Sequence, residues 1–409
     1  MEDCILSVPV PAGASGSAMK DVTNLIAGLE PFVEEEEPEP SAEERKRMFQ
    51  KQQEISRQIK AEKRLLNRDL AAELRERLKK AKEDLARRQE RRALELQAEQ
   101  KLLDFDPKQG GAYYSRLNLV YDIANFDHDE ESPLGSMRFT DVDMGDIKLC
   151  AALNILSVKI ASLDVDFPIL VYGKVIARDS LDQRCVYLFK RDKDDSQLIN
   201  SKDETLILTG PKRGLALISS TYIEIDLKIR GHQGQVDREL SKGVLEIQGM
   251  ARRVLKKCEL ESRSLATRLS TVAVIYSVVK SAVEATIFSI TVLEVEFNGA
   301  IYAFTSSMRN GILLHDSKLL HHVRIKNNGR LIELVRNVVT VYLKEKLILA
   351  FLSGSCDCQH DDGITQVILT PTRRGWLELT PKLNGRDKMI VTLGVTKIRV
   401  EVAWSIIYY

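Results

Sequence analysis

The sequence predicts an all-β globular unit of antiparallel, sandwich-like sheets, preceded by a long charged α-helix and a disordered N-terminal tail. Three changes in composition along the chain indicate this organisation. Residues 1–40 are acidic and rich in Gly, Ser and Pro, whereas residues 41–102 contain neither Gly nor Pro and are dominated by charged side chains. From residue 146 onwards, short β-branched runs alternate with Gly, Asp, Asn and Pro, which is typical of strands joined by turns.

The bulk properties of the chain narrow its class. Its 409 residues are enough for two or three domains, and its formal net charge of +1 excludes polyanion binding by the chain as a whole. Neither a signal-peptide pattern nor an apolar run long enough to span a bilayer is present, and the six cysteines are scattered apart from Cys356 and Cys358. We therefore expect a cytoplasmic or nuclear protein with reduced thiols and no contact with membranes.

Residues 1–40 are expected to form an acidic, disordered tail. The run from Glu34 to Glu37 is followed by Pro38 and Pro40, and the segment has too little apolar surface to offset the entropy of ordering it. An alternative is a docking motif around Val22, Leu25, Ile26 and Leu29, which have helical spacing.

Residues 41–102 are expected to form one long helix. Ser41 and Glu44 match a capping box directly after Pro40. Acid-first pairs four residues apart, such as Glu73 with Arg77, favour a helix with an exposed charged surface.

An apolar stripe runs along this predicted helix, and its role is left open between a coiled-coil contact and a solvated single helix. The stripe resembles a heptad seam, but repeated four-residue steps between Leu66 and Leu78 depart from the heptad. Basic clusters at residues 79–82 and 87–92 could contact RNA or a nuclear import receptor, although acidic residues are interleaved with them. The stripe consists of Met48, Ile55, Ile59, Leu66, Leu70, Leu74, Leu78, Ala81 and Leu85.

Residues 103–145 are expected to be a connector, and residues 146–409 the β-rich domain, in which two related halves lie near 146–260 and 261–409. The halves are suggested by a weak internal repeat, in which a strand at 222–228 and a strand at 338–344 each follow a Gly-containing basic turn. The stretch near residues 250–260 is the one expected helix of this region. We also expect a fragment starting near Pro133 to fold without the helix.

Several runs of the β-region together resemble one known family. They occur in the family's order and span the chain from about Pro133 to the C-terminus: 167–173 (FPILVYG), 177–182 (ARDSLD), 206–215 (LILTGPKRGL), 224–229 (EIDLKI), 239–243 (ELSKG), 283–287 (VEATI) and 404–406 (WSI).

The chain thus resembles the uncharacterised grass proteins grouped as domain of unknown function 6598. The resemblance implies a plant protein with a β-rich fold, and it implies no agreed activity, so it assigns no catalytic residue. Similar domains are sometimes found alongside ribosome-inactivating glycosidase domains. This sequence has no separate region long enough for such an enzyme, and its nearest approach to the active-site helix is Glu333 with Arg336 in the run 332–336 (IELVR).

The candidate metal ligands have simpler interpretations as loop residues. Cys356, Cys358 and His360 could bind zinc or copper, but a second Cys pair is missing, so a polar hairpin loop is favoured. The neighbouring residues His321 and His322 would point to opposite faces of a strand. A calcium site is disfavoured because lysines and an arginine are interleaved among its candidate ligands Asp179, Asp182, Asp192, Asp194 and Asp195.

Two further candidates concern anion binding and catalysis. The run 210–214 (GPKRG) lacks the Lys-Ser/Thr ending of a phosphate loop and is interpreted as a basic turn, in which Lys212 and Arg213 are the residues most suited to bind a ligand. Glu333 and Arg336 would share a face on a helix, and would point to opposite sides of a strand.

We therefore predict no catalytic, cofactor-binding or metal-binding residues, and a non-catalytic interaction module in a plant cell. Its partner would be a protein bound through the helix or the β-domain surface, and the helix could join copies of the chain. The alternatives are an enzyme related to ribosome-inactivating RNA N-glycosidases, and an RNA-binding protein that uses the basic helix.

Overall fold

The computed structural model describes residues 41–142, 145, 148–202, 204–231, 235–249, 258–294, 297–319, 330–353, 359–361, 364–366 and 373–408. The expected tail over residues 1–40 lies outside these residues, and so do His321, His322, Cys356 and Cys358. The chain divides into two compact units, Met1–Ala86 and Arg87–Tyr409.

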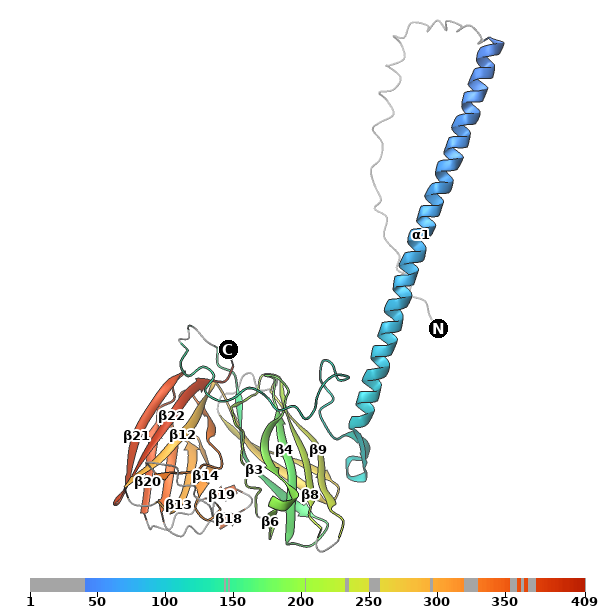
Figure 1. Ribbon diagram of the computed structural model, residues 1–409. Helices are drawn as coiled ribbons and strands as arrows, with labels where there is room; N and C mark the ends of the chain where they lie inside the picture. The colour runs from blue at the N-terminus through green and yellow to red at the C-terminus, as the bar shows by residue number, and fades with distance from the viewer. Residues whose placement is uncertain are drawn as a thin grey trace, which may run out of the picture. The chain divides into compact units, whose positions relative to one another are not determined.

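The expected charged helix is confirmed as α1 (Ala42–Leu102) (Figure 1). Its start is the expected capping box: the Ser41 N–H donates to Glu44 Oε2 at 2.9 Å, and the Glu44 N–H donates to Ser41 Oγ at 3.3 Å. Arg77 lies 2.7 Å from Glu73, one of the expected acid-first pairs. The helix ends at Leu102, which is buried in the second unit.

The region after the helix is built from antiparallel sheets, as expected, and they form two sandwiches (Figure 1). In the first, one sheet has the order β10-β11-β3-β7 and the other the order β5-β4-β8-β9, in which β6 also pairs with β4. The strands are β3 (Ala152–Leu163), β4 (Ile169–Arg178), β5 (Val186–Arg191), β6 (Gln197–Ile199), β7 (Leu215–Ala216), β8 (Ser220–Ile229), β9 (Arg238–Gln248), β10 (Glu259–Thr267) and β11 (Ser270–Val279).

The second sandwich has one sheet of order β21-β22-β12 with β16 on the far side of β12, and a facing sheet of order β14-β13-β17-β20. The short strand β15 also pairs with β12. The strands are β12 (Ala282–Glu294), β13 (Gly299–Thr305), β14 (Met308–Asp316), β15 (Arg330–Leu331), β16 (Val338–Tyr342), β17 (Leu347–Ser353), β20 (Arg373–Leu379), β21 (Gly385–Leu393) and β22 (Thr396–Ile406). A separate two-stranded sheet joins β18 (Gln359–Asp361) to β19 (Ile364–Gln366).

The two sandwiches share one strand order, because β10-β11-β3-β7 corresponds to β21-β22-β12-β16 and β5-β4-β8-β9 to β14-β13-β17-β20. Two details differ from the sequence-based expectation. The first sandwich extends to Val279 rather than to residue 260, because β11 pairs with β3 over its whole length. The weak repeat matched β8 with β16, which occupy different places in the two sandwiches.

Each sandwich has its own core, formed where inward-facing residues of its two sheets meet. Along β8, Ile223, Ile225 and Leu227 are buried at every second position, as expected for a strand with one covered face. In the second core, Trp404 on β22 is fully buried. Most of the stretch near residues 250–260 lies outside the described residues, but Glu259 and Leu260 begin β10 and are therefore not helical.

The connector contains regular structure and packs on the β-region. It opens with the hairpin β1 (Leu103–Asp106) and β2 (Gly111–Tyr114), linked by the short helix η1 (Pro107–Gln109). Leu117 and Ile123 are buried, so the segment is packed rather than free. Beyond them, Ser132 donates its N–H to the Cys185 carbonyl at 2.9 Å.

Candidate functional site

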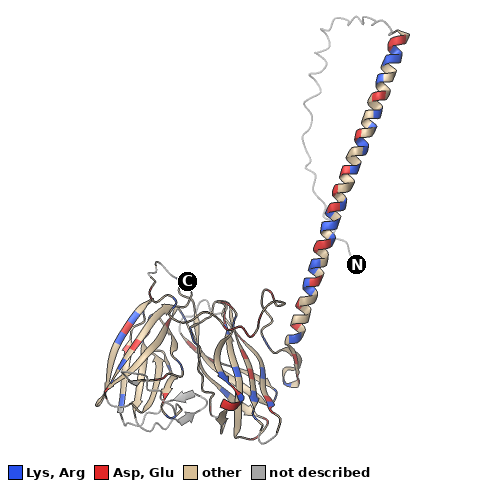
Figure 2. Ribbon diagram, viewed as in Figure 1, with Lys and Arg blue, Asp and Glu red and all other residues tan. Residues whose placement is uncertain are grey.

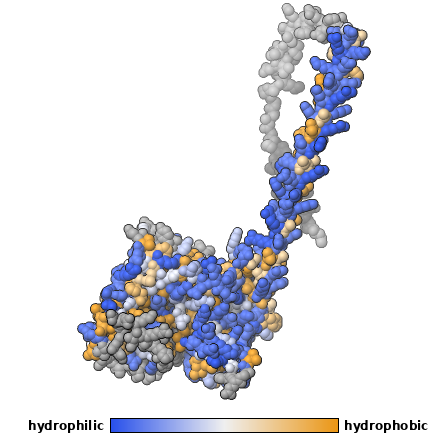
Figure 3. All heavy atoms as spheres, viewed as in Figure 1, coloured by the Kyte–Doolittle hydropathy of each residue, from blue (hydrophilic) through white to orange (hydrophobic). Residues whose placement is uncertain are grey.

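The apolar stripe of α1 is exposed to solvent along its length. The exposed fractions of its large side chains range from 47% at Ile59 to 68% at Leu66. At about 100° per residue, these side chains fall within an arc of roughly 140° of the helix surface. Figure 3 shows hydrophobic patches on an otherwise hydrophilic helix, and Figure 2 shows acidic and basic side chains mixed along it. The stripe is therefore an exposed apolar surface within the single chain.

The basic clusters of α1 are partly neutralised by neighbouring acids. Lys80 lies 3.2 Å from Glu76, and Arg91 and Arg92 both contact Glu95, at 3.1 and 3.4 Å. In Figure 2, acidic residues interrupt the basic ones along the whole visible side of the helix. This mixture weakens the attraction for a phosphate backbone that an RNA-binding helix needs.

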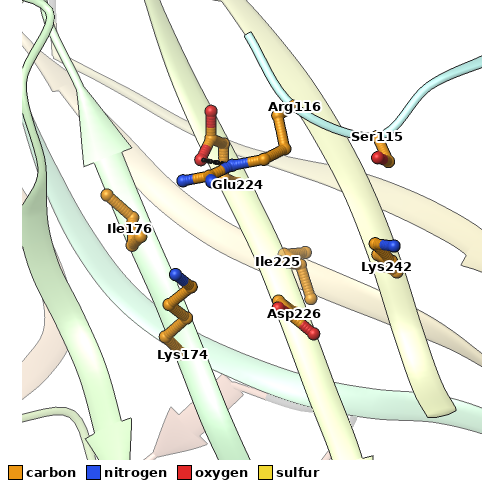
Figure 4. Close-up of a pocket in the computed structure, with 8 residues that line it drawn as sticks. All are labelled: Ser115, Arg116, Lys174, Ile176, Glu224, Ile225, Asp226 and Lys242. Atoms are coloured by element: carbon orange, nitrogen blue, oxygen red, sulfur yellow. Dashed lines mark hydrogen bonds and ion pairs between the residues drawn. The ribbon is translucent and has the colours of Figure 1, made fainter. Parts of the chain in front are cut away.

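A cluster of charged residues lies where the connector crosses the outer face of β4 and β8 (Figure 4). Glu224 on β8 accepts hydrogen bonds from the buried Arg178 guanidinium at 2.8 and 3.0 Å. From the connector, Arg116 contacts Glu224 at 3.3 Å, and the Leu117 N–H donates to it at 2.9 Å. Arg116 also reaches Asp129, which Lys174 contacts at 2.8 Å.

The electrostatics of this cluster indicate an anchor for the connector. Burial acts to raise the pKa of Glu224, but the hydrogen bonds and charge of Arg178, the charge of Arg116 and the Leu117 N–H outweigh it, so the net pKa is lowered. The adjoining cavity has a volume of only about 40 Å³, room for about one water molecule and too little for a substrate. Chemically, the cluster binds the connector to the first sandwich.

This cluster predicts that acid destabilises the protein. Hydrogen bonding from Lys174 lowers the pKa of Asp129 to about 2, and the pKa of Glu224 is also lowered. Carboxyls with lowered pKa values stabilise the fold above their unfolded pKa, near about 4, and lose that contribution as the pH falls through the folded value. We expect the urea midpoint to fall between about pH 5 and pH 3, and to fall less in Glu224→Gln. An unchanged midpoint over this range would contradict the assignment.

The sequence suggested Lys212 and Arg213 as ligand-binding residues. In the structure both side chains pair with carboxylates of the chain itself. Arg213 is 1% exposed and contacts the buried Asp179 at 2.6 and 3.0 Å, while Lys212 contacts Glu131 at 2.7 Å. Gly210 is required by packing, because a Cβ there would lie 1.9 Å from the Tyr187 carbonyl oxygen. The run 210–214 is therefore a structural turn.

Glu284 on β12 joins the connector and both sandwiches. It accepts the Gly214 N–H at 2.6 Å, from the turn of the first sandwich, and the Met137 N–H at 2.8 Å, from the connector. Glu284 is 4% exposed, and burial raises its pKa. Beside it, the connector continues onto the second sandwich, where the Phe139 N–H donates to Ser405 Oγ at 3.1 Å.

The remaining candidates do not assemble into a site. Asp179 pairs with Arg213 after β4, whereas Asp194 and Asp195 lie in the short helix η2 (Lys193–Asp195) after β5, where Asp195 pairs with Arg191. Among the described residues, no group of three His, Cys, Asp or Glu side chains is placed to hold a metal ion.

Glu333 and Arg336 do not form the pair that a helix would create. The segment between β15 and β16 that contains them is neither helix nor strand. Glu333 is exposed and its carbonyl accepts a hydrogen bond from the His315 ring at 2.7 Å, whereas Arg336 is buried.

The sequence-based search did not identify Arg178, Glu224, Arg116 or Glu284 as important. Charge alone does not single out Arg178 and Glu224, because other charged residues such as Lys174 lie in the same two strands. Their pairing spans 46 positions, so only the sheet register reveals it.

Comparisons with known proteins identify the family. Domain of unknown function (DUF6598) matches residues 152–402, so the chain belongs to this family. No curated protein matches the sequence. A structure of two C2 domains, A and B, of Extended-Synaptotagmin 2 is similar at 9% identity with a TM-score of 0.21, over 69% of this chain and 99% of that one. "Human GIVD cytosolic phospholipase A2" has 9% identity and a TM-score of 0.18, over 64% of this chain and 33% of that one.

At these scores neither structural likeness supports an argument about function. Within the described part of the chain, no helix has an apolar run long enough to cross a membrane.

Proposed function

We propose that this protein is a non-catalytic interaction module that associates with a second copy of itself through α1. The observation that carries the proposal is the apolar stripe of α1, whose leucines and isoleucines remain about half exposed or more within the single chain. Full burial of one such side chain contributes about 1.5–3 kcal/mol, so leaving the stripe in water is costly.

A second copy is the partner that the stripe fits best. Every copy carries the same stripe, and the mixed acids and bases beside it can pair across a helix–helix interface in either orientation. Along the stripe, apolar residues recur at more than about 3.5 residues per helical turn, which is the heptad value. The interface is therefore expected to differ from a strict heptad coiled coil. The two sandwiches then become binding units that occur twice in the assembly.

The test compares two substitutions with equal charge change on opposite faces of α1. Leu74→Lys places a charge in the stripe, while Ala72→Lys places it about 160° away on the helix surface. We expect Leu74→Lys to weaken self-association at least about tenfold, since one buried leucine is worth more than about 1.4 kcal/mol. Light scattering coupled to gel filtration over a range of concentrations measures this.

Equal effects of the two substitutions would contradict the proposal. A wild-type chain that stays monomeric, with helicity that does not depend on concentration, would favour the solvated single helix instead. Binding to RNA that is weakened by neutralising Lys79 and Lys80 would favour the RNA-binding alternative.

A further inference from the structure

A cleft between the two sandwiches has the dimensions of a ligand site. Its volume is about 490 Å³, within the range of small-molecule sites. One wall comes from β3, β6 and the segment 204–208 of the first sandwich, and the other from β13, β14 and Arg336 of the second. Leucines dominate its surface, among them Leu156, Leu206 and Leu313.

Arg336 is the unusual group in this cleft. The residue is 4% exposed, yet within the described part of the chain its one hydrogen bond runs from Nη2 to the Ile155 carbonyl at 2.7 Å. Its Nε is buried without a partner there. Burial lowers the pKa of Arg336 to about 10, and among the described residues no carboxylate offsets that effect.

Two other buried arginines of the described chain have the carboxylate partner that Arg336 lacks among the described residues. Arg178 is paired with Glu224, and Arg213 with Asp179, at hydrogen-bonding distances. A buried charge without a counter-charge is strongly unfavourable, so a binding partner that supplies one gains affinity from pairing with it. Arginine is suited to this role because its planar fork can bind both oxygens of a carboxylate.

We propose that the cleft binds an organic carboxylate with an apolar body, whose carboxylate pairs with Arg336 and whose body lies against the leucines. Arg336 is the one cation among the described residues that line the cleft, and Glu204 and Asp316 also line it, so a dianion such as a phosphate ester is disfavoured. This site is independent of the self-association of α1.

The test uses the full chain and three probes with the same apolar body: octanoate, 1-octanol and octyl phosphate. We expect calorimetry to show octanoate binding at least about tenfold tighter than either of the others, as pairing with a buried charge requires. Arg336→Met should lose this preference, because it removes the charge and keeps a long apolar side chain. Arg399→Met, which changes an arginine of β22 outside the cleft, is the matched control and should bind octanoate as wild type does.

A second variant guards against misfolding of Arg336→Met. Ser157→Phe fills the cleft from β3 and leaves Arg336 in place, so it should weaken octanoate binding while circular dichroism stays unchanged. Octanoate that binds equally to wild type and Arg336→Met, that does not bind at millimolar concentration, or that binds no better than 1-octanol or octyl phosphate would overturn the proposal.

Discussion

Replacing Glu224 with alanine is expected to lower the free energy of unfolding by about 3–5 kcal/mol. The substitution leaves the fully buried Arg178 without its counter-charge and the Leu117 N–H without its acceptor. Arg116 loses a partner as well, so the connector is released from β8. Urea denaturation at pH 7 measures the change.

Asp226→Ala is the matched control. Asp226 lies two residues further along β8, on the same face, and is half-buried. Its removal should cost under about 1 kcal/mol, in line with a carboxylate that keeps contact with solvent. Similar losses for the two variants would show that the Glu224 cluster is not an anchor.

Removing the connector is expected to lower the free energy of unfolding by at least as much as Glu224→Ala does. A fragment of residues 87–409 keeps the connector, whereas a fragment of residues 133–409 exposes Glu224 and Arg178 and loses the buried Leu117 and Ile123. Each buried apolar side chain that is lost costs about 1.5–3 kcal/mol. The fragment also loses the hydrogen bonds that Arg116 and the Leu117 N–H donate to Glu224. The shorter fragment should therefore unfold at a markedly lower urea concentration, or without a cooperative transition.

The contacts of the connector argue against the expectation that the chain from Pro133 onwards folds alone, and the two fragments test it. Composition located the end of the helix and the start of the strands, but it did not show which contacts join the segment between them to the first sandwich. Equal denaturation midpoints for the two fragments would support the sequence-based prediction that the folded region begins near Pro133.

Features fixed by neighbours in the sequence were predictable. The capping box of Ser41 and Glu44 and the pair of Glu73 with Arg77 involve residues three or four apart, and both are present as expected. Period-two alternation likewise predicted strands such as β8. These patterns depend on local geometry, which follows from the spacing of residues along the sequence.

Features that depend on sheet pairing were not predictable. The first sandwich includes β11 because Val278 pairs with Leu153, a residue far away in the sequence. Arg336 was singled out for a helical pairing with Glu333 that does not occur, yet its buried, unpaired guanidinium is visible only when β3 and its Ile155 carbonyl are placed beside it. The strand order that the two sandwiches share was also not predicted, since it depends on which strands pair.

Sedimentation equilibrium of the full chain and of a fragment of residues 87–409 tests the central claim most directly. The fragment lacks the exposed stripe residues from Met48 to Leu85 and keeps both sandwiches. We predict twice the chain mass for the full protein at micromolar concentration and the monomer mass for the fragment. A monomeric full chain, or a fragment that dimerises as tightly as the full chain, would contradict self-association through α1.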